Sequence, residues 1–156
     1  MGTGVSTANE ALDVGAGLRW LTGRQGADGS WGQKDKLALT GMSGLALLAS
    51  GSTPTRGPFA VNVSRAIDFV LRSQTDGRGG FTHPSSGYSA IHNHGYALLF
   101  LTQAYGEGGP LDDRMRVSIT QGLKATIDSQ RTKSGSPIDG GFTYFLYGQA
   151  PPTTDM

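Results

Sequence analysis

The sequence predicts an all-α protein made of repeated helical hairpins, in which outer amphipathic helices alternate with inner apolar helices. Three observations support this fold class. One pattern of residues around a glutamine occurs three times, a Gly-rich turn and an aromatic residue follow each copy, and the intervening segments have helical periodicity. Repeats spaced in this way are typical of arrays of helical hairpins.

Three glutamines, Gln25, Gln74 and Gln130, mark the repeat, and they lie 49 and 56 residues apart. Each has a small residue eight positions before it and an aliphatic residue seven positions before it. Asp and Gly residues in the following turns suit the end of a helix and a reversal of the chain. The aromatic residues that close the three turns are Trp31, Phe81 and Phe142.

Two kinds of helix are expected between these signals. Residues 9–25, 61–74 and 112–130 are predicted to form outer helices, because their apolar residues fall on one helical face. Residues 36–50 and 88–105 are apolar nearly all round. Such helices are usually buried on every face, so we expect these two to be the inner helices.

The repeat pattern stops where a third inner helix is expected, at residues 150–156. We therefore interpret residues 1–156 as a single partial domain, either a fragment or one part of a larger assembly. Its repeats end near residues 25–31, 74–81 and 130–142. An apolar helix without a neighbour exposes its apolar surface, so the expected partner is another protein chain or the missing repeats.

The segment from Leu18 through Gln25 to Trp31 resembles the QW motif of squalene-hopene cyclases, which belong to the terpenoid cyclase and prenyltransferase superfamily. The second and third copies carry Phe81 and Phe142 in place of Trp. The resemblance covers about residues 9–145 and implies an α/α toroid, here a partial ring, with an apolar central cavity. It also implies that three pairs are structural braces between outer helices: Gln25 with Trp31, Gln74 with Phe81, and Gln130 with Phe142.

The catalytic motifs of this superfamily are absent from the sequence. There is no Asp-x-Asp-Asp acid motif, no Asp-rich magnesium motif and no Cys for a prenyltransferase zinc site. No metal and no cofactor is therefore expected. Asp112 and Asp113 are the only adjacent carboxylates, and we interpret them as the acidic start of an outer helix, where they favour the helix dipole.

A few residues remain as weak candidates for chemistry. Asp155 lies where cyclases place their acid, although it also suits a helix N-cap. His94 lies in a His-Gly-Tyr-Ala string on an inner helix, where a structural histidine is the competing interpretation. The expected lining of a ligand cavity is Tyr88, His92, His94 and Tyr96.

Two functional hypotheses follow, together with a weaker third. The first is a non-catalytic binding or scaffold module with an apolar cavity or groove, which could take an isoprenoid ligand. The second is part of an isoprenoid cyclase whose acid motif lies outside these residues. The third, a glycan-processing α/α barrel, lacks an evident pair of carboxylates on the inner helices.

Charge and hydropathy limit the partners and leave the compartment open. The net charge of +1 provides no basic field for nucleic acid. No apolar run reaches the length of a transmembrane helix. A bacterial cytoplasmic protein and a processed secreted or periplasmic protein both fit the sequence.

Overall fold

The computed structural model describes residues 13–148 apart from 75–76, 87–89, 132–136 and 138, and no strand occurs in that part of the chain. The all-α prediction is confirmed for these residues. There are five α-helices, and three short 3-10 helices lie in the connections between and after them. The α-helices are α1 (Val14–Thr22), α2 (Lys36–Ala49), α3 (Ala60–Arg72), α4 (Ala90–Ala104) and α5 (Asp112–Ser129), and the 3-10 helices are η1 (Pro84–Ser86), η2 (Gly109–Leu111) and η3 (Leu146–Gly148).

The centre of the fold is the packing of α2 against α4, the most extensive contact between two helices in the described chain. Two glycines of α2 allow this close approach. A Cβ atom on Gly41 would lie 2.5 Å from the carbonyl oxygen of Tyr96, and one on Gly44 would collide with the ring of Phe100. The two helices expected on the inside therefore meet backbone to backbone at Gly41.

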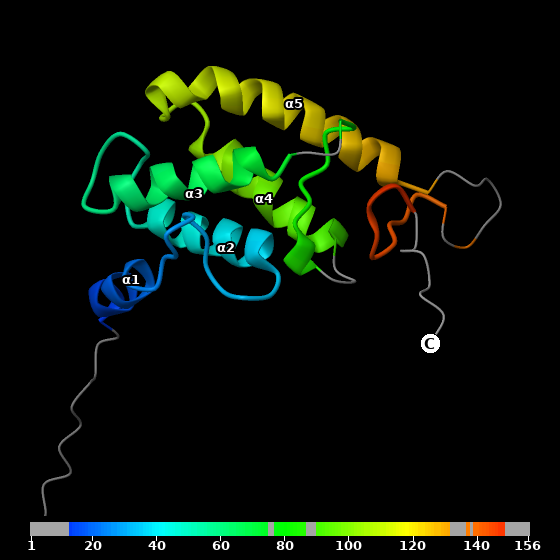
Figure 1. The fold of residues 1–156 in the computed structure, drawn as a ribbon. Helices are drawn as coiled ribbons and strands as arrows, with labels where there is room; N and C mark the ends of the chain where they lie inside the picture. The colour runs from blue at the N-terminus through cyan, green and yellow to red at the C-terminus, as the bar shows by residue number, and fades with distance from the viewer. Residues whose placement is uncertain (1–12, 75–76, 87–89, 132–136, 138, 149–156) are drawn as a thin grey trace, which may run out of the picture.

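The outer helices pack on this pair in order along the chain. Helix α3 lies against α2, and α5 lies against α4 (Figure 1). The core between them contains fully buried apolar side chains from four helices and from the second turn. Its largest members are Phe81, Phe100, Leu37, Leu47, Ile67, Leu101 and Met115. Burial of each such side chain stabilises the fold by about 1.5–3 kcal/mol.

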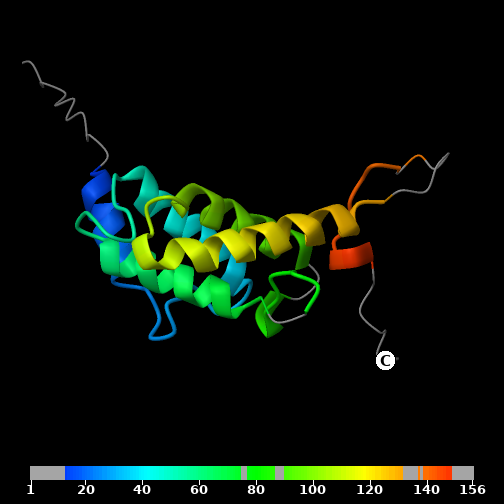
Figure 2. The same cartoon turned by 90° about the horizontal axis from the view of Figure 1, so that it is seen from above.

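Helices α1 and α5 lie at opposite ends of the array (Figures 1 and 2). Helix α1 contains no buried residue, which is consistent with its position at one end. The side chain of Asp13 caps it by accepting a hydrogen bond from the Ala16 amide at 2.9 Å. Residues 9–12 of the first expected outer helix lie outside the described residues.

The expectation that the inner helices are buried on every face is wrong for both of them. Leu39 and Met42 on α2 are exposed, and so are Tyr96 and Leu99 on α4. The physical reason is that each helix has one side on which no other described helix packs. The apolar composition that suggested complete burial thus creates two exposed apolar surfaces.

Candidate functional site: the corners and the open edge

The first two glutamines connect consecutive outer helices through the same set of hydrogen bonds. Gln25 Nε2 donates to the carbonyl of Gly29 at 2.9 Å and to that of Asn62 on α3 at 3.0 Å. Asn62 Nδ2 donates in return to Gln25 Oε1 at 2.7 Å. The glutamine thus fixes its own turn and the next helix with one amide group. We call this arrangement a corner.

The second corner repeats these contacts one helix later. Gln74 Nε2 donates to the carbonyls of Gly79 at 2.7 Å and Ser118 on α5 at 2.9 Å. Ser118 Oγ donates to Gln74 Oε1 at 2.6 Å. Ser118 therefore has the role of Asn62, and each of them lies twelve residues before the next glutamine.

In the first two corners, a glycine touches the backbone of the next outer helix. Gly29 and Gly79 both have left-handed backbones, with φ of 90° and 91°. A Cβ atom on Gly29 would collide with the carbonyl oxygen of Arg65, and one on Gly79 would collide with that of Gln121. Arg65 and Gln121 occupy equivalent places, nine residues before Gln74 and Gln130. Both junctions between outer helices therefore have the same geometry.

The third corner repeats the hydrogen bond from its glutamine to a turn glycine, and no described helix follows it. Gln130 Nε2 donates to the carbonyl of Gly140 at 2.8 Å, and Gly140 has φ of 80°. The Arg131 amide donates to the Gly141 carbonyl, and the Gly140 amide donates to the Arg131 carbonyl. These two bonds match those that Gly26 makes with Ser30 and Gly29 in the first corner. A Cβ atom on Gly140 would find its nearest neighbour, Gln130 Nε2, only at 4.0 Å. No described residue fills the place that Arg65 and Gln121 take in the other corners.

The aromatic residues that close the first two turns are buried, whereas the one that closes the third turn is exposed. Trp31 and Phe81 are 4% and 0% exposed, whereas Phe142 is 51% exposed. The amide of Trp31 donates to Thr40 Oγ1 on α2 at 3.2 Å, and that of Phe81 donates to His94 Nδ1 on α4 at 3.1 Å. An inner helix thus binds each of the first two aromatic residues.

His94, one of the catalytic candidates, lies in the core as a connecting side chain. It is 1% exposed and packs its ring beside Phe81, with centroids 5.4 Å apart. Nδ1 accepts from the Phe81 amide, so Nε2 carries the proton and donates to Thr126 Oγ1 on α5 at 2.9 Å. Thr126 Oγ1 in turn donates to Gly122 O. His94 therefore joins the second corner, α4 and α5.

We call one surface of α4 and α5 the open edge and define it by five residues. They are Gly95 and Leu99 on α4, Leu123 and Ile127 on α5, and the third closing aromatic residue, Phe142. Leu123 is 50% exposed and Ile127 is 69% exposed. The residue equivalent to Leu123, seven before Gln74, is Ile67, which is completely buried. The open edge is therefore apolar at positions that are covered one repeat earlier.

The inner helices show the same difference between a covered position, Gly41, and an uncovered position, Gly95. It follows His94 as Gly41 follows Thr40, and Thr40 and His94 bind equivalent amides. Gly41 touches the backbone of Tyr96, whereas a Cβ atom on Gly95 would have nothing within 4 Å. The side of α4 that bears Gly95 is thus equivalent to the side of α2 that packs on α4.

The other expected cavity residues lie apart from one another. His92 is exposed, and its ring lies 5.6 Å from that of Tyr144, in a shallow pocket that also contains Phe142. Tyr96 is partly exposed on α4 beside Gly41. Tyr88 and Asp155 lie outside the described residues.

A larger groove lies between the C-terminal ends of α2 and α4. Its volume is about 550 Å³, and its apolar wall includes Leu45, Leu48 and Leu99. Gln103 and Glu107 are among its polar lining residues, and Glu107 pairs with Arg56 at 2.9 Å. Leu99 belongs to both the groove and the open edge.

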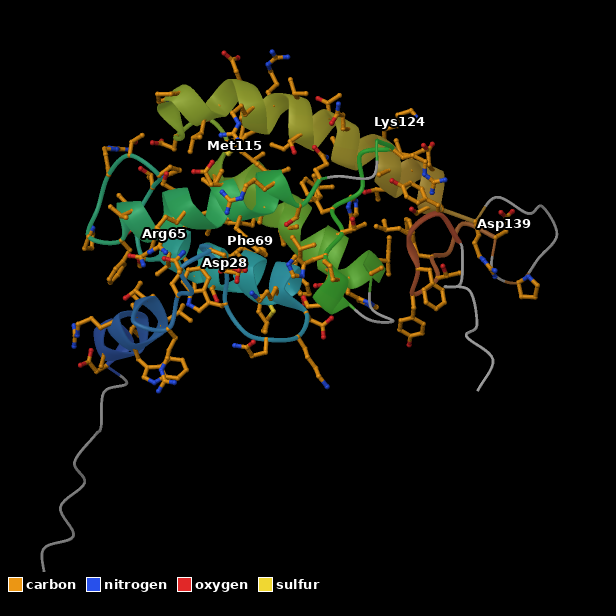
Figure 3. All side chains as sticks on the ribbon, in the orientation of Figure 1. Asp28, Arg65, Phe69, Met115, Lys124 and Asp139 are labelled. Atoms are coloured by element: carbon orange, nitrogen blue, oxygen red, sulfur yellow. The ribbon has the colours of Figure 1, made fainter. Side chains whose placement is uncertain are left out.

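Most of the described carboxylates have structural partners, and two of them bear on the search for a catalytic acid. Asp112 starts α5 and accepts hydrogen bonds from the amides of Gly106 and Gly108 at 3.0 and 3.1 Å. Asp28 in the first turn binds Lys36 Nζ at 2.8 Å and Ser30 Oγ at 2.7 Å (Figure 3). The hydrogen bond from Lys36, with those from Ser30, holds the pKa of Asp28 well below its usual range. Asp28 is therefore a poor proton donor.

A polar cluster that sequence reasoning missed joins η1 to the start of α2. His83 Nδ1 lies 2.8 Å from Ser85 Oγ, and that hydroxyl accepts from the Lys36 amide at 3.1 Å. Asp35, which precedes α2 with a left-handed φ of 48°, accepts from Asn93 Nδ2 at 2.8 Å. Burial and the charge of Lys36 lower the pKa of His83.

Sequence reasoning also missed Asn62 and Ser118, the two residues that complete the corners. Their shared distance from the next glutamine is a signal in the sequence, but their different residue types conceal it. Only the position is repeated, because either side chain can donate to the glutamine oxygen.

Neither a metal cluster nor a membrane span is found in the part of the chain that the structure describes. No three His, Asp or Glu side chains gather there in a way that could hold a metal ion. Each described helix falls short of the length and apolar character that crossing a bilayer requires.

Comparison with known proteins gives no assignment: no family model, no curated protein and no solved structure matches the chain.

Proposed function

We propose that this chain is a non-catalytic binding or scaffold module, a partial ring of the α/α-toroid type, whose open edge receives a helical partner. The single observation that carries the proposal is the repeated geometry of the corners. Two corners each fix a following outer helix, and the third repeats the bond from glutamine to glycine with no described helix against it. A surface with this shape is suited to a further helix.

The composition of the open edge supports the proposal. Leu123, Ile127 and Phe142 present apolar surface at positions whose equivalents, Ile67 and Phe81 among them, are buried within the array. Exposed apolar side chains that gather on one surface are typical of interaction sites. The groove beside Leu99 extends this surface and is the proposed site for an apolar ligand such as an isoprenoid.

A role as part of an isoprenoid cyclase has less support from the described residues. Protonation of an alkene needs a carboxylic acid that stays protonated in a dry pocket. Asp28 has the opposite electrostatic environment, and Asp112 is engaged by two loop amides. Asp155, the remaining acid candidate, lies outside the described residues.

Substitution on the open edge tests the binding role. We expect the wild-type chain to self-associate weakly at high concentration, since apolar surface that lacks its partner tends to bind other copies. Leu123→Lys combined with Ile127→Lys should abolish this association. Both side chains are at least half exposed, so the free energy of unfolding should change by less than about 1 kcal/mol. Sedimentation equilibrium measures the first effect and urea denaturation the second.

Val61→Lys is the matched control, because Val61 is 72% exposed on α3, away from the open edge. It should leave self-association unchanged. A wild-type chain that stays monomeric at high concentration, or a control that abolishes association equally, would contradict the proposed role of the open edge.

A further inference from the structure

The third corner specifies which helix it can receive, and this inference rests on the proposed function of the open edge. In both filled corners the incoming outer helix brings three groups: a backbone carbonyl for the glutamine Nε2, a side chain that donates to the glutamine Oε1, and a peptide group that lies against the corner glycine. Asn62 and Ser118 supply the first two groups in their respective corners.

Gln130 offers the same two bonding positions. Its Nε2 is held by Gly140, and its Oε1 has no bonding partner among the described residues. Gly140 leaves open the space where Gly29 and Gly79 contact a carbonyl group of the next helix. The site therefore has both the hydrogen-bonding groups and the shape that select the occupant in the other two corners.

An inner helix must accompany this outer helix. Leu123 and Ile127 on α5 are equivalent to Ile67 and Leu71 on α3, and Ile67 is completely buried in the core while Leu71 packs against it. Gly95 leaves room for a second backbone, as Gly41 does for the backbone of Tyr96. A single helix cannot cover both the Gln130 corner and the side of α4 that bears Gly95.

A second copy of this chain cannot fill the third corner, so its association through the apolar open edge stays weak. Its α3 and α5 already occupy corners, so only α1 is available for Gln130. The residue of α1 twelve positions before its glutamine is Asp13, and an ionised carboxylate cannot donate to Gln130 Oε1. Asp13 is also engaged in capping α1 through the Ala16 amide.

We propose that the open edge recognises a helical hairpin of a partner chain, with an apolar inner helix against Gly95 and an outer helix that presents Ser or Asn to Gln130. The Ser or Asn hydroxyl or amide donates to Gln130 Oε1, and the backbone carbonyl of the same residue accepts from Nε2. Three residues later, the partner helix lies against Gly140.

A chain extended by one of its own repeats tests this proposal. In the extended chain, residues 1–142 are followed directly by a second copy of residues 82–156. A second copy of α4 and α5 then follows the third corner. The second copy of Ser118 then has the spacing to reach Gln130. We expect one cooperative unfolding transition at higher urea than in the wild-type chain. The Gln130 side-chain amide should exchange its hydrogens at least about tenfold more slowly, as measured by NMR.

Two substitutions confined to the added copy separate recognition from general apolar binding. Ser118→Ala in that copy should restore fast exchange at Gln130, while Thr120→Ala, at an exposed site on the same helix, should leave exchange slow. If the added repeat folds cooperatively and Ser118→Ala changes nothing, the corner recognition is wrong and the proposed function stands. If the added repeat stays unfolded, both are wrong.

Cleavage at a protease site placed after Phe142 tests binding by a separate chain. The two pieces should remain together on size-exclusion chromatography. Separation of the pieces would contradict docking of a partner chain at this edge.

Discussion

At the scale of single residues, the glutamine side chain suits a corner because its amide group carries a donor and an acceptor at the same end. Gln25 uses both atoms on Asn62, and Gln74 uses both on Ser118. Each net hydrogen bond of this kind contributes about 1 kcal/mol. The glutamine positions could be predicted because residue type and spacing both repeat. Their partners could not, because two different side chains perform the same task.

The histidines show a second limit of the sequence at this scale. His94 was a candidate for catalysis or for the cavity, and the structure places it between the Phe81 amide and Thr126. His83 was not selected, yet it belongs to the cluster that holds the start of α2. Residue type alone does not distinguish these environments, since hydrogen bonds between distant segments decide them.

His83 also gives a prediction about pH. Burial and the positive charge of Lys36 lower its pKa in the folded chain below the ordinary value of 6.5, while Asp28 acts in the opposite direction. The unfolded chain therefore binds more protons as pH falls through 6.5, and stability should decrease until pH drops below the folded pKa. NMR titration of the His83 ring should show the lowered pKa.

His83→Gln supplies the control for this titration. The variant should lose less stability than the wild-type chain when urea unfolding is compared at about pH 8 and about pH 5. An equal loss in both chains, or a His83 pKa above 6.5, would contradict the environment described for this residue.

At the scale of the elements, the number, type and order of the α-helices follow from the sequence. The inner segments 36–50 and 88–105 correspond to α2 and α4, and the outer segment 112–130 corresponds to α5. Helical periodicity and the Gly-rich turns are local signals, so they can be seen in one sequence. Which side of each inner helix is covered depends on distant segments, and here the expectation of complete burial was wrong.

Two glycines on the inner helices test the packing of α2 and α4. Gly41→Ala should destabilise the chain by about 2 kcal/mol, because the new Cβ would press on the Tyr96 backbone and force the helices apart. Gly95→Ala should stabilise it by about 0.5–1 kcal/mol, since Ala favours a helix and no described atom lies within 4 Å of the new Cβ. Urea denaturation measures both.

Gly41→Ala and Gly95→Ala are matched controls for each other, because each glycine follows a polar residue that accepts a hydrogen bond from a turn amide. Effects of the same sign would show that α2 and α4 do not approach each other at Gly41, or that α4 is covered at Gly95.

At the scale of the whole molecule, the described part of the chain is an array with two filled corners and one open corner. The filled corners follow one another along the outer helices, and the third lies beyond α5, at the end of the array opposite α1 (Figure 1). The surface ion pairs contribute little to the stability of this array, because an exposed pair such as Arg114 with Asp68 is worth at most about 1 kcal/mol.

The repeat could be predicted at this scale, whereas its chemistry could not. Three equivalent glutamines predict equivalent turns, and Gln25, Gln74 and Gln130 each donate a hydrogen bond to a glycine carbonyl of the following turn. The toroidal arrangement, the ligand and any catalytic acid depend on surfaces that contact groups outside the described residues. The partial ring, the cavity residues and the binding role therefore stay predictions.

The most direct test of the account compares Gln25→Ala, Gln74→Ala and Gln130→Ala by urea denaturation of the wild-type chain and the three variants. The first two should each lower the free energy of unfolding by about 2 kcal/mol, since each removes the bonds to a turn and to the next helix. Gln130→Ala should lower it by less than about 1 kcal/mol, because its side chain bonds only to Gly140 among the described residues. Equal losses for all three variants, or none for the first two, would contradict the claim that two corners are filled and one is open.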